Sequence, residues 1–274
     1  MIGQGDGTGG GERHLGDMAK GESAAAGGKG NPALRVMVVV PIHNEETHVG
    51  SLLEKLRGIV EGGAVEQVVF VDDGSTDQTG EVLRRAAQVR VVRHPRRCGC
   101  GASIRSGYRQ AMAQGVEVVV VMAGNGKDDP REIPKLLEPI LRGRADYVQG
   151  SRFLQGGASK GLPWHRFVAM RLLTWLMRLF LWRWLTDCTN GFRAYRTTLL
   201  RDARLDWEQA WLGNDYELEL YMHYKAATLG YRLVEVPVAK VYQRAKDGSY
   251  SKARLGDWFT GLRPVFYLRL GLRK

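Results

Sequence analysis

The sequence has little cysteine, and the little it has forms neither a metal-binding nor a disulfide pattern. The three cysteines are Cys98, Cys100 and Cys188. Cys98 and Cys100 are separated by a single residue, which is too close for the usual zinc spacings, and no cluster of cysteine and histidine lies nearby. We therefore interpret all three as free thiols in a reducing compartment.

The sequence also lacks the motifs that define two common function classes. It contains no GxxxxGK[ST] segment, which excludes a P-loop kinase. It contains no recognised nucleic-acid-binding motif, so we expect no nucleic acid among its partners although the net charge is +11. The polyanions that this charge favours are then diphosphates and anionic membranes. The alternative is a generally basic, soluble surface.

A third absence is that of long hydrophobic runs. No segment reaches about 20 uninterrupted apolar residues, so no membrane-spanning helix is predicted. The nearest approach, residues 166–185, is interrupted by Arg171, Arg178 and Arg183, and residues 258–272 have a similar composition. Apolar bulk with tryptophan and interspersed arginine is typical of helices that lie in the membrane interface. The alternatives are a helix packed on the core with arginines at its rim, or an interface of a homo-oligomer.

These patterns predict a simple organisation of the chain. Residues 1–33 are rich in glycine and show no periodicity, so we expect a disordered tail. The tail lacks the apolar core of a signal peptide. We expect one domain over residues 34–254 and a C-terminal amphipathic segment over 255–274 that contacts the membrane interface. The predicted location is cytoplasmic, peripheral at the inner face of the membrane.

Strand and helix patterns alternate along the domain and predict an α/β fold. Apolar, β-branched runs at the predicted strands alternate with helical periodicity, beginning with RVMVVVP at 35–41 and QVVFV at 67–71. Such alternation predicts right-handed crossovers and a mainly parallel central sheet with helices on both faces. Ligands of such sheets bind outside the carboxyl ends of the strands. The polar loops 41–45, 72–77 and 123–129 should therefore converge on one edge.

Further segments extend this pattern toward the C-terminus. Shorter strands are expected at 90–93, 116–122, 146–150 and 231–236, helices at 102–114, 133–141, 166–185 and 215–229, and a loop at 187–193.

Carboxylates in these loops are candidates for binding a nucleotide. Asp72 and Asp73 directly follow an apolar strand, where a carboxylate can accept hydrogen bonds from a nucleobase or ribose. The alternative is an Asx turn that leads into the next helix. Farther along, Glu217 and Glu219 lie two residues apart and so point to different faces of a helix, which leaves at most one of them facing the site.

Basic residues in or beside the loops are candidates for binding phosphate. Guanidinium groups suit phosphate oxygens because they donate two parallel hydrogen bonds. Each residue taken alone is also explained as a solvated surface charge. The candidates are Arg152, Arg166, Arg193, Arg244 and Lys252.

Taken in order, the motifs resemble family 2 glycosyltransferases with a GT-A fold, and most closely the polyprenyl- or dolichyl-phosphate sugar synthases. The matching segments include VVVPIHNEE at 38–46, VVFVDDGSTDQT at 68–79, GSRF at 150–153, TDCTNGFRAYR at 186–196 and YQRAKDGSYSK at 242–252. Together the matches cover nearly everything after residue 35. The resemblance implies a Rossmann-like three-layer sandwich and an inverting enzyme with a nucleotide-diphospho-sugar donor.

The resemblance also assigns roles to single residues. It implies an arginine on the donor side at Arg152 and phosphate-binding cations at Arg193, Arg244 and Lys252, to which we add Arg166. The donor-binding set that it implies is Pro41, His43, Glu45, Val71, Asp73, Gly124 and Asn125.

The sequence departs from the family where two aspartates normally hold a divalent metal. The expected D-A-D-x-Q reads Ala123-Gly124-Asn125-Gly126-Lys127. Ala123 cannot bind a metal, and Asn125 offers only one neutral oxygen, which suits Mg²⁺ or Mn²⁺ poorly. Either the Lys127 ammonium replaces the metal, or Asp128 and Asp129 supply carboxylates from a shifted loop. The third alternative is a nucleotide-sugar-binding or regulatory protein that has lost catalysis.

The acceptor decides whether a general base is needed. A lipid phosphate is already anionic and needs none, whereas a hydroxyl acceptor needs one, for which Asp215 or Glu219 would be the candidates. The basic, aromatic segments 166–185 and 258–272 favour the lipid phosphate at an anionic membrane surface.

Overall fold

Two alternating sets of side chains on each central strand build the core. The structure, a computed structural model, describes residues 34–242 and 255–273. On β1 (Val36–Ile42), Val38 and Val40 face one side of the sheet, and Met37 and Val39 face the other. All four are fully buried. A strand buried on both faces belongs in a parallel sheet that is covered by helices on both sides.

The main sheet has seven strands in the order β3-β2-β1-β4-β7-β5-β8. Every neighbouring pair is parallel except the two pairs that β7 makes with β4 and β5. The predicted mainly parallel α/β sheet is therefore confirmed. The remaining strand bounds are β2 (Gln67–Asp72), β3 (Arg90–Arg93), β4 (Val118–Val121), β5 (Tyr147–Ser151), β7 (Arg193–Arg196) and β8 (Leu233–Pro237).

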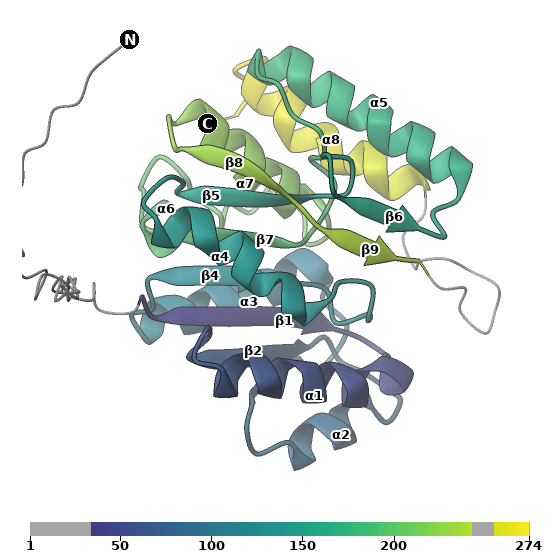
Figure 1. Ribbon diagram of the computed structural model, residues 1–274. Coiled ribbons are helices and arrows are strands. Elements are labelled where there is room, and N and C mark those ends of the chain that lie inside the picture. The colour runs from purple at the N-terminus through teal and green to yellow at the C-terminus, as the bar shows by residue number, and fades with distance from the viewer. Residues whose placement is uncertain (1–33, 243–254, 274) are drawn as a thin grey trace, which may run out of the picture. The chain divides into compact units, whose positions relative to one another are not determined.

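Helices cover both faces of this sheet, as Figure 1 shows. Three of them (α1, α2 and α4) pack on the face that carries Val38 and Phe70, while α3, α5, α7 and α8 pack on the face that carries Val39 and Val71. None of the helices within the described ranges is long and apolar enough to cross a membrane. The helix bounds are α1 (Glu46–Glu61), α2 (Thr79–Arg85), α3 (Cys100–Ala113), α4 (Ile133–Leu141), α5 (Trp164–Leu181), α6 (Thr197–Leu200), α7 (Glu217–Thr228) and α8 (Leu255–Arg269), with a 3₁₀ turn η1 (Pro130–Glu132) before α4.

Three short strands were not expected from the sequence. The predicted loop 187–193 runs into β7, which is inserted antiparallel between β4 and β5. Its four residues, RAYR, carry too little apolar pattern to signal a strand, and main-chain pairing with two buried neighbours holds it. The other two, β6 (Ala158–Lys160) and β9 (Ala239–Val241), form a separate small parallel sheet.

The helix predicted over 166–185 begins and ends earlier than expected. It occupies Trp164–Leu181, and Trp182 then takes a left-handed conformation with φ 49°. Such a conformation ends a helix, and it is uncommon for residues other than glycine and asparagine. Residues 182–185 therefore turn back toward the sheet, where Leu185 is fully buried.

Close contact between α3 and β1 requires a glycine, and this gives a stability prediction. A Cβ built on Gly107 lies 2.1 Å from Val39 Cγ1. We expect Gly107→Ala to lower the free energy of unfolding by ~1–3 kcal/mol, because the added methyl overpacks the core. Urea unfolding measures this. The matched control is Gly58→Ala on α1, where a built Cβ meets nothing within 4 Å and the change should stabilise by ~0.5–1 kcal/mol. Equal stability of Gly107→Ala and the parent protein would contradict the packing argument.

Candidate active site

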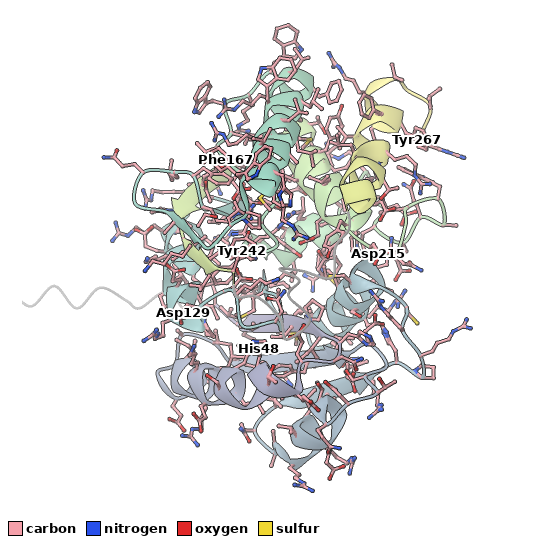
Figure 2. All side chains as sticks on the ribbon, turned by 90° about the vertical axis from the view of Figure 1, so that its right-hand side faces the viewer. His48, Asp129, Phe167, Asp215, Tyr242 and Tyr267 are labelled. Atoms are coloured by element: carbon pink, nitrogen blue, oxygen red, sulfur yellow. The ribbon has the colours of Figure 1, made fainter. Side chains whose placement is uncertain are left out.

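The loops after β1, β2 and β4 meet at one edge of the sheet, as the alternating pattern predicted. The amide of Asn44 donates to Ser75 Oγ at 3.0 Å, and the amide of Glu45 donates to Thr79 Oγ1 at 2.8 Å. The amide of Gly124 donates to the carbonyl oxygen of Pro41 at 3.0 Å. Figure 2 looks onto this edge, with Tyr242 between His48 and Phe167, and with Asp129 and Asp215 on either side.

The two aspartates after β2 have different roles. Asp72 Oδ1 accepts a hydrogen bond from the Ser75 amide at 2.9 Å, which is the turn that we considered as an alternative. Asp73 instead holds the loop before α3: its Oδ1 accepts from the Cys98 amide and its Oδ2 from the Gly99 amide, both at 2.8 Å. His94 Nδ1 lies 2.8 Å from Asp73 Oδ1. Asp73 thus joins the end of β2 to residues 94–99.

These hydrogen bonds lower the pKa of Asp73. Burial by itself raises the pKa of this carboxyl, but the hydrogen bonds from His94, Cys98 and Gly99 together outweigh it and hold the pKa below its usual value. Asp73, His94 and Cys98 each place one potential metal-ligand atom in a cluster, and these three atoms lie within 4.8 Å of one another. His94 and Cys98 also make other contacts: His94 Nε2 lies 2.9 Å from Ser106 Oγ, and Cys98 Sγ donates to the Arg96 carbonyl at 3.3 Å.

The other residues expected to bind the donor lie at the same edge. Pro41 and Val71 are register partners on β1 and β2. The Val71 side chain is fully buried in the core, so only its main chain can face a ligand. Glu45 Oε2 lies 3.0 Å from His48 Nδ1, and His43 is half-buried beside it in the loop.

The loop that departs from the family is packed tightly against β1. A Cβ on Gly124 would lie 2.8 Å from Ile42 Cβ, so a larger residue cannot fit without displacing the strand. Asn125 Oδ1 accepts a hydrogen bond from the Lys127 amide at 3.3 Å. The Lys127 ammonium lies 5.8 Å from the centroid of the Tyr242 ring. The pKa of Lys127 falls to about 8, chiefly through burial and secondly through the nearby Lys240.

Both aspartates that follow in this loop are engaged by cations of the protein. Asp128 is buried, and its Oδ1 lies 2.8 Å from Lys240 Nζ. Lys240 also donates to Asn190 Oδ1 at 2.9 Å. Asp129 accepts from the Arg131 amide at 3.1 Å, which caps η1, and its Oδ2 lies 2.6 Å from the Arg131 guanidinium. Lys240 was not expected from the sequence, because a single lysine in a short strand carries no signal of burial.

The arginines predicted to bind phosphate lie in different surroundings. Arg152 follows β5 and is buried, with Nε and Nη2 donating to the two oxygens of Asp187 at 2.7 and 2.9 Å. Its Nη1 donates to Tyr242 Oη. Arg166 lies in the first turn of α5, close enough to Lys127 to lower the pKa of that lysine.

Arg193 was expected in a loop, but it lies in β7 and is buried. Its Nη1 donates to Tyr147 Oη at 2.9 Å and to the Glu219 carbonyl at 2.6 Å, and its Nε donates to the Asn190 carbonyl at 3.0 Å. The guanidinium is also 3.7 Å from Glu219 Oε1. These groups occupy the fork of Arg193, so its role toward phosphate stays a prediction. Arg244 and Lys252 lie outside the described residues.

Asp215 and Glu219 lie near each other around Cys100. A Cβ on Gly99 would lie 2.9 Å from Asp215 Oδ1, and one on Gly191 would lie 2.7 Å from Glu219 Oε1. Burial raises the pKa of the Cys100 thiol, and the charges of Glu219 and Asp215 raise it further. Glu217 points instead toward its own loop, where it accepts from the Asp215 amide at 3.3 Å.

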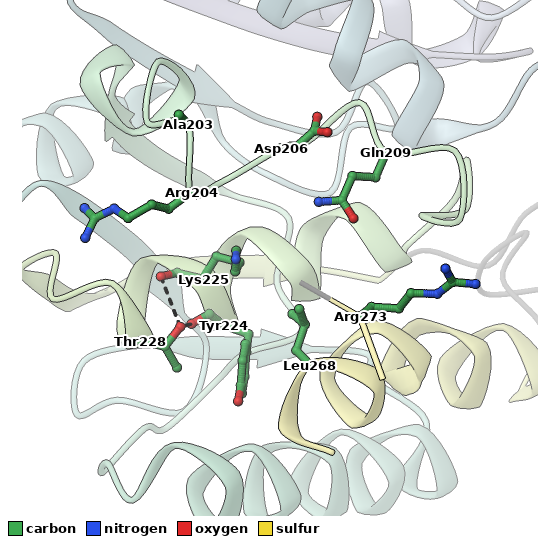
Figure 3. Close-up of a pocket in the computed structure, with 9 residues that line it drawn as sticks. All are labelled: Ala203, Arg204, Asp206, Gln209, Tyr224, Lys225, Thr228, Leu268 and Arg273. Atoms are coloured by element: carbon green, nitrogen blue, oxygen red, sulfur yellow. Dashed lines mark hydrogen bonds between the residues drawn. The ribbon is translucent and has the colours of Figure 1, made fainter. Parts of the chain in front are cut away.

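Two cavities lie outside the three loops. One of about 390 Å³ adjoins Arg152 and is lined mainly by apolar groups, including Phe153, Trp164 and Phe167. The other, of about 530 Å³, lies between α7, the 203–209 segment and the end of α8, as Figure 3 shows. It contains none of the residues predicted for the site.

Comparison with known proteins places this geometry in a family. The model of the family described as glycosyl transferase family 2 matches residues 37–204. The chain is 33% identical over 232 residues to the undecaprenyl-phosphate mannosyltransferase of Micrococcus luteus, covering 82% of this chain and 90% of the relative. It is 29% identical over 214 residues to the polyprenol monophosphomannose synthase of Mycolicibacterium smegmatis, covering 76% of this chain and 77% of the relative.

Solved structures of other proteins share the fold of this chain. Glucosyl-3-phosphoglycerate synthase from Mycobacterium tuberculosis, in complex with Mn²⁺, uridine diphosphate and glucosyl-3-phosphoglycerate, has a TM-score of 0.63 and 21% identity, covering 88% of this chain and 81% of that one. The fold that the two share is that of the GT-A glycosyltransferases. The convergent loops, the sheet and the match over residues 37–204 lead to one conclusion: the chain belongs to glycosyltransferase family 2 and is a glycosyltransferase.

Proposed function

We propose that the protein transfers a sugar from a nucleotide-diphosphate donor to the phosphate of a polyprenyl lipid at the surface of an anionic membrane. The names of two relatives, an undecaprenyl-phosphate mannosyltransferase and a polyprenol monophosphomannose synthase, support this acceptor. In the proposed step, a lipid phosphate oxygen bonds to the anomeric carbon and inverts it. The bond from that carbon to the donor diphosphate breaks, and its electron pair leaves on the nucleotide diphosphate.

The observation that carries the proposal is an exposed apolar stripe on α5 that leads to the candidate site. Its members recur every three or four residues, so they share one face of the helix. The α5 stripe consists of Trp164, Val168, Leu172, Trp175, Leu179 and the adjoining Trp182, all exposed. The opposite face of α5, including Met170 and Met177, is buried in the core.

The stripe is continuous with Arg152. Phe167, on the first turns of α5, packs edge-to-face on Phe153 with ring centroids 5.5 Å apart. The Arg152 guanidinium lies 5.3 Å from the centroid of the same Phe153 ring. A lipid whose chain lies along the stripe would therefore bring its phosphate toward the cations at the start of α5. The net charge of the chain, +11, favours an anionic bilayer over a neutral one.

The arginines that interrupt the apolar segment do not oppose this arrangement. Arg171, Arg178 and Arg183 donate to the carbonyls of Thr186, Leu185 and Leu233. Arg178 also stacks on Trp184, with its guanidinium carbon 3.9 Å from the ring centroid. Main-chain carbonyls of residues 185–186 and of β8 therefore hold these guanidinium groups.

A transfer assay tests the acceptor. Labelled guanosine- and uridine-diphospho sugars are incubated with polyprenyl phosphate or with the matching polyprenol. We expect label to enter the lipid phosphate and not the alcohol, because the phosphate oxygen is anionic and the alcohol needs a base. Transfer to the alcohol alone would overturn the proposal and direct attention to Asp215 and Glu219.

We predict that Asp73→Asn weakens binding of the nucleotide diphosphate at least tenfold while the protein stays folded. The change removes a carboxylate that orders residues 94–99 beside the candidate base-binding position. Isothermal titration calorimetry measures the affinity and circular dichroism the fold. The control is Asp202→Asn, which removes a carboxylate bonded to Arg204 and Tyr231 on another part of the chain. Unchanged affinity in Asp73→Asn would show that this carboxylate and the loop it orders do not contribute to binding the nucleotide diphosphate.

We predict that replacing both Trp175 and Trp182 with serine releases the protein from vesicles of phosphatidylglycerol. These indoles are exposed on the stripe, and rings of this kind bind at the level of the lipid headgroups. Co-sedimentation at low salt measures the bound fraction. The control is Leu141→Ser, because this exposed leucine ends α4, away from the stripe. Wild-type protein that stays in the supernatant would refute the membrane proposal.

A further inference from the structure

The loop between β4 and η1 does not fit a divalent metal ion. GT-A relatives of known structure include one crystallised with Mn²⁺. Here Ala123 has no ligand atom, and the oxygen of Asn125 already accepts the Lys127 amide. The carboxylates of Asp128 and Asp129 lie against Lys240 and Arg131 at 2.8 and 2.6 Å. Ligands for Mg²⁺ or Mn²⁺ are charged or strongly dipolar oxygens that are free to point at the ion, and this loop offers none.

The buried pair of Asp128 and Lys240 also fixes the position of the loop. Asp128 and Lys240 form an isolated antiparallel bridge, and the Val241 amide donates to the Lys127 carbonyl at 3.1 Å. Separating the ion pair would leave a buried charge without a partner, which carries a large desolvation penalty. Moving Asp128 out to hold a metal is therefore unfavourable, and the main chain of Lys127 is held in place by β9.

Lys127 is a cation of this loop whose charge is not paired with a carboxylate of the described residues. Within residues 34–242 and 255–273, its ammonium makes no ion pair with a carboxylate, in contrast to Lys240 and Arg131. The ammonium nitrogen lies 5.8 Å from the centroid of the Tyr242 ring. Lys127 stands two residues after Asn125, on the loop that follows β4 at the ligand-binding edge of the sheet. An ammonium here is a compact point charge that suits phosphate oxygens.

We propose that the Lys127 ammonium takes the place of the divalent ion and neutralises the diphosphate of the donor. This inference rests on the proposed nucleotide-diphosphate donor. As the bond to the anomeric carbon breaks, negative charge grows on the leaving diphosphate, and a fixed cation in a site from which water is partly excluded stabilises it. Lys240 serves as a positioning residue, since its own charge is already matched by Asp128.

The first test measures binding without turnover. Uridine and guanosine diphosphate are titrated into the full-length protein by calorimetry, in EDTA and in MnCl₂. We expect the same dissociation constant in both buffers for the parent protein. Lys127→Gln should raise it at least tenfold, and Lys127→Arg, which keeps the charge, should restore most of the affinity. The control is Lys135→Gln, because Lys135 pairs with Glu132 on the outer face of α4.

A gain-of-function variant gives the second test. In the Lys127→Gln background, Ala123→Asp and Asn125→Asp together return the two carboxylates. We expect this triple variant to bind Mn²⁺, seen by electron paramagnetic resonance, and to bind the diphosphate only when Mn²⁺ is present. Loss of binding by the parent protein in EDTA, with recovery in Mn²⁺ and no effect of Lys127→Gln, would overturn the inference. The proposed function fails separately if the donor binds but no sugar reaches polyprenyl phosphate.

Discussion

The parallel alignment of β1, β2 and β4 is the constraint on which the rest of the structure depends. Because the strands run in one direction, their carboxyl ends lie at one edge, and three polar loops meet there. Hydrogen bonds between the loops, such as that from Gly124 to Pro41, then fix their spacing. The alignment in turn requires strands that are apolar on both faces, which the valine-rich sequences of β1 and β4 supply.

Charged groups at this edge are held by one another. Arg152 forms a two-point hydrogen bond with Asp187, and Lys240 pairs with Asp128. Each pair joins segments that are far apart in the sequence, so the pairs fix loop geometry more than they add net stability. Lys127 differs from these cations, because within residues 34–242 and 255–273 its ammonium makes no ion pair with a carboxylate. The polar edge is a pre-arranged electrostatic environment, which is what stabilising a leaving diphosphate requires.

Helix α5 connects the proposed membrane-binding surface to the candidate active site. Its buried face is anchored by Leu173 and Met177, and its exposed face carries the α5 stripe. The same helix starts with Arg166 and Phe167 beside the candidate site. A surface that would bind the bilayer is thus rigidly connected to the position where the lipid phosphate would react.

The sequence by itself determined the fold class, the alternation of strands and helices in the first half and the edge where the polar loops meet, because burial on both faces and helical periodicity are local patterns. It also revealed the absent aspartates at positions 123 and 125. Only the tertiary structure decided which charges are free. Three findings depend on contacts between distant segments. Asp128 pairs with Lys240, Arg193 lies within a strand, and Asp73 holds residues 94–99. Local sequence carries no record of such contacts, since a charged side chain looks the same whether it meets water or a buried partner.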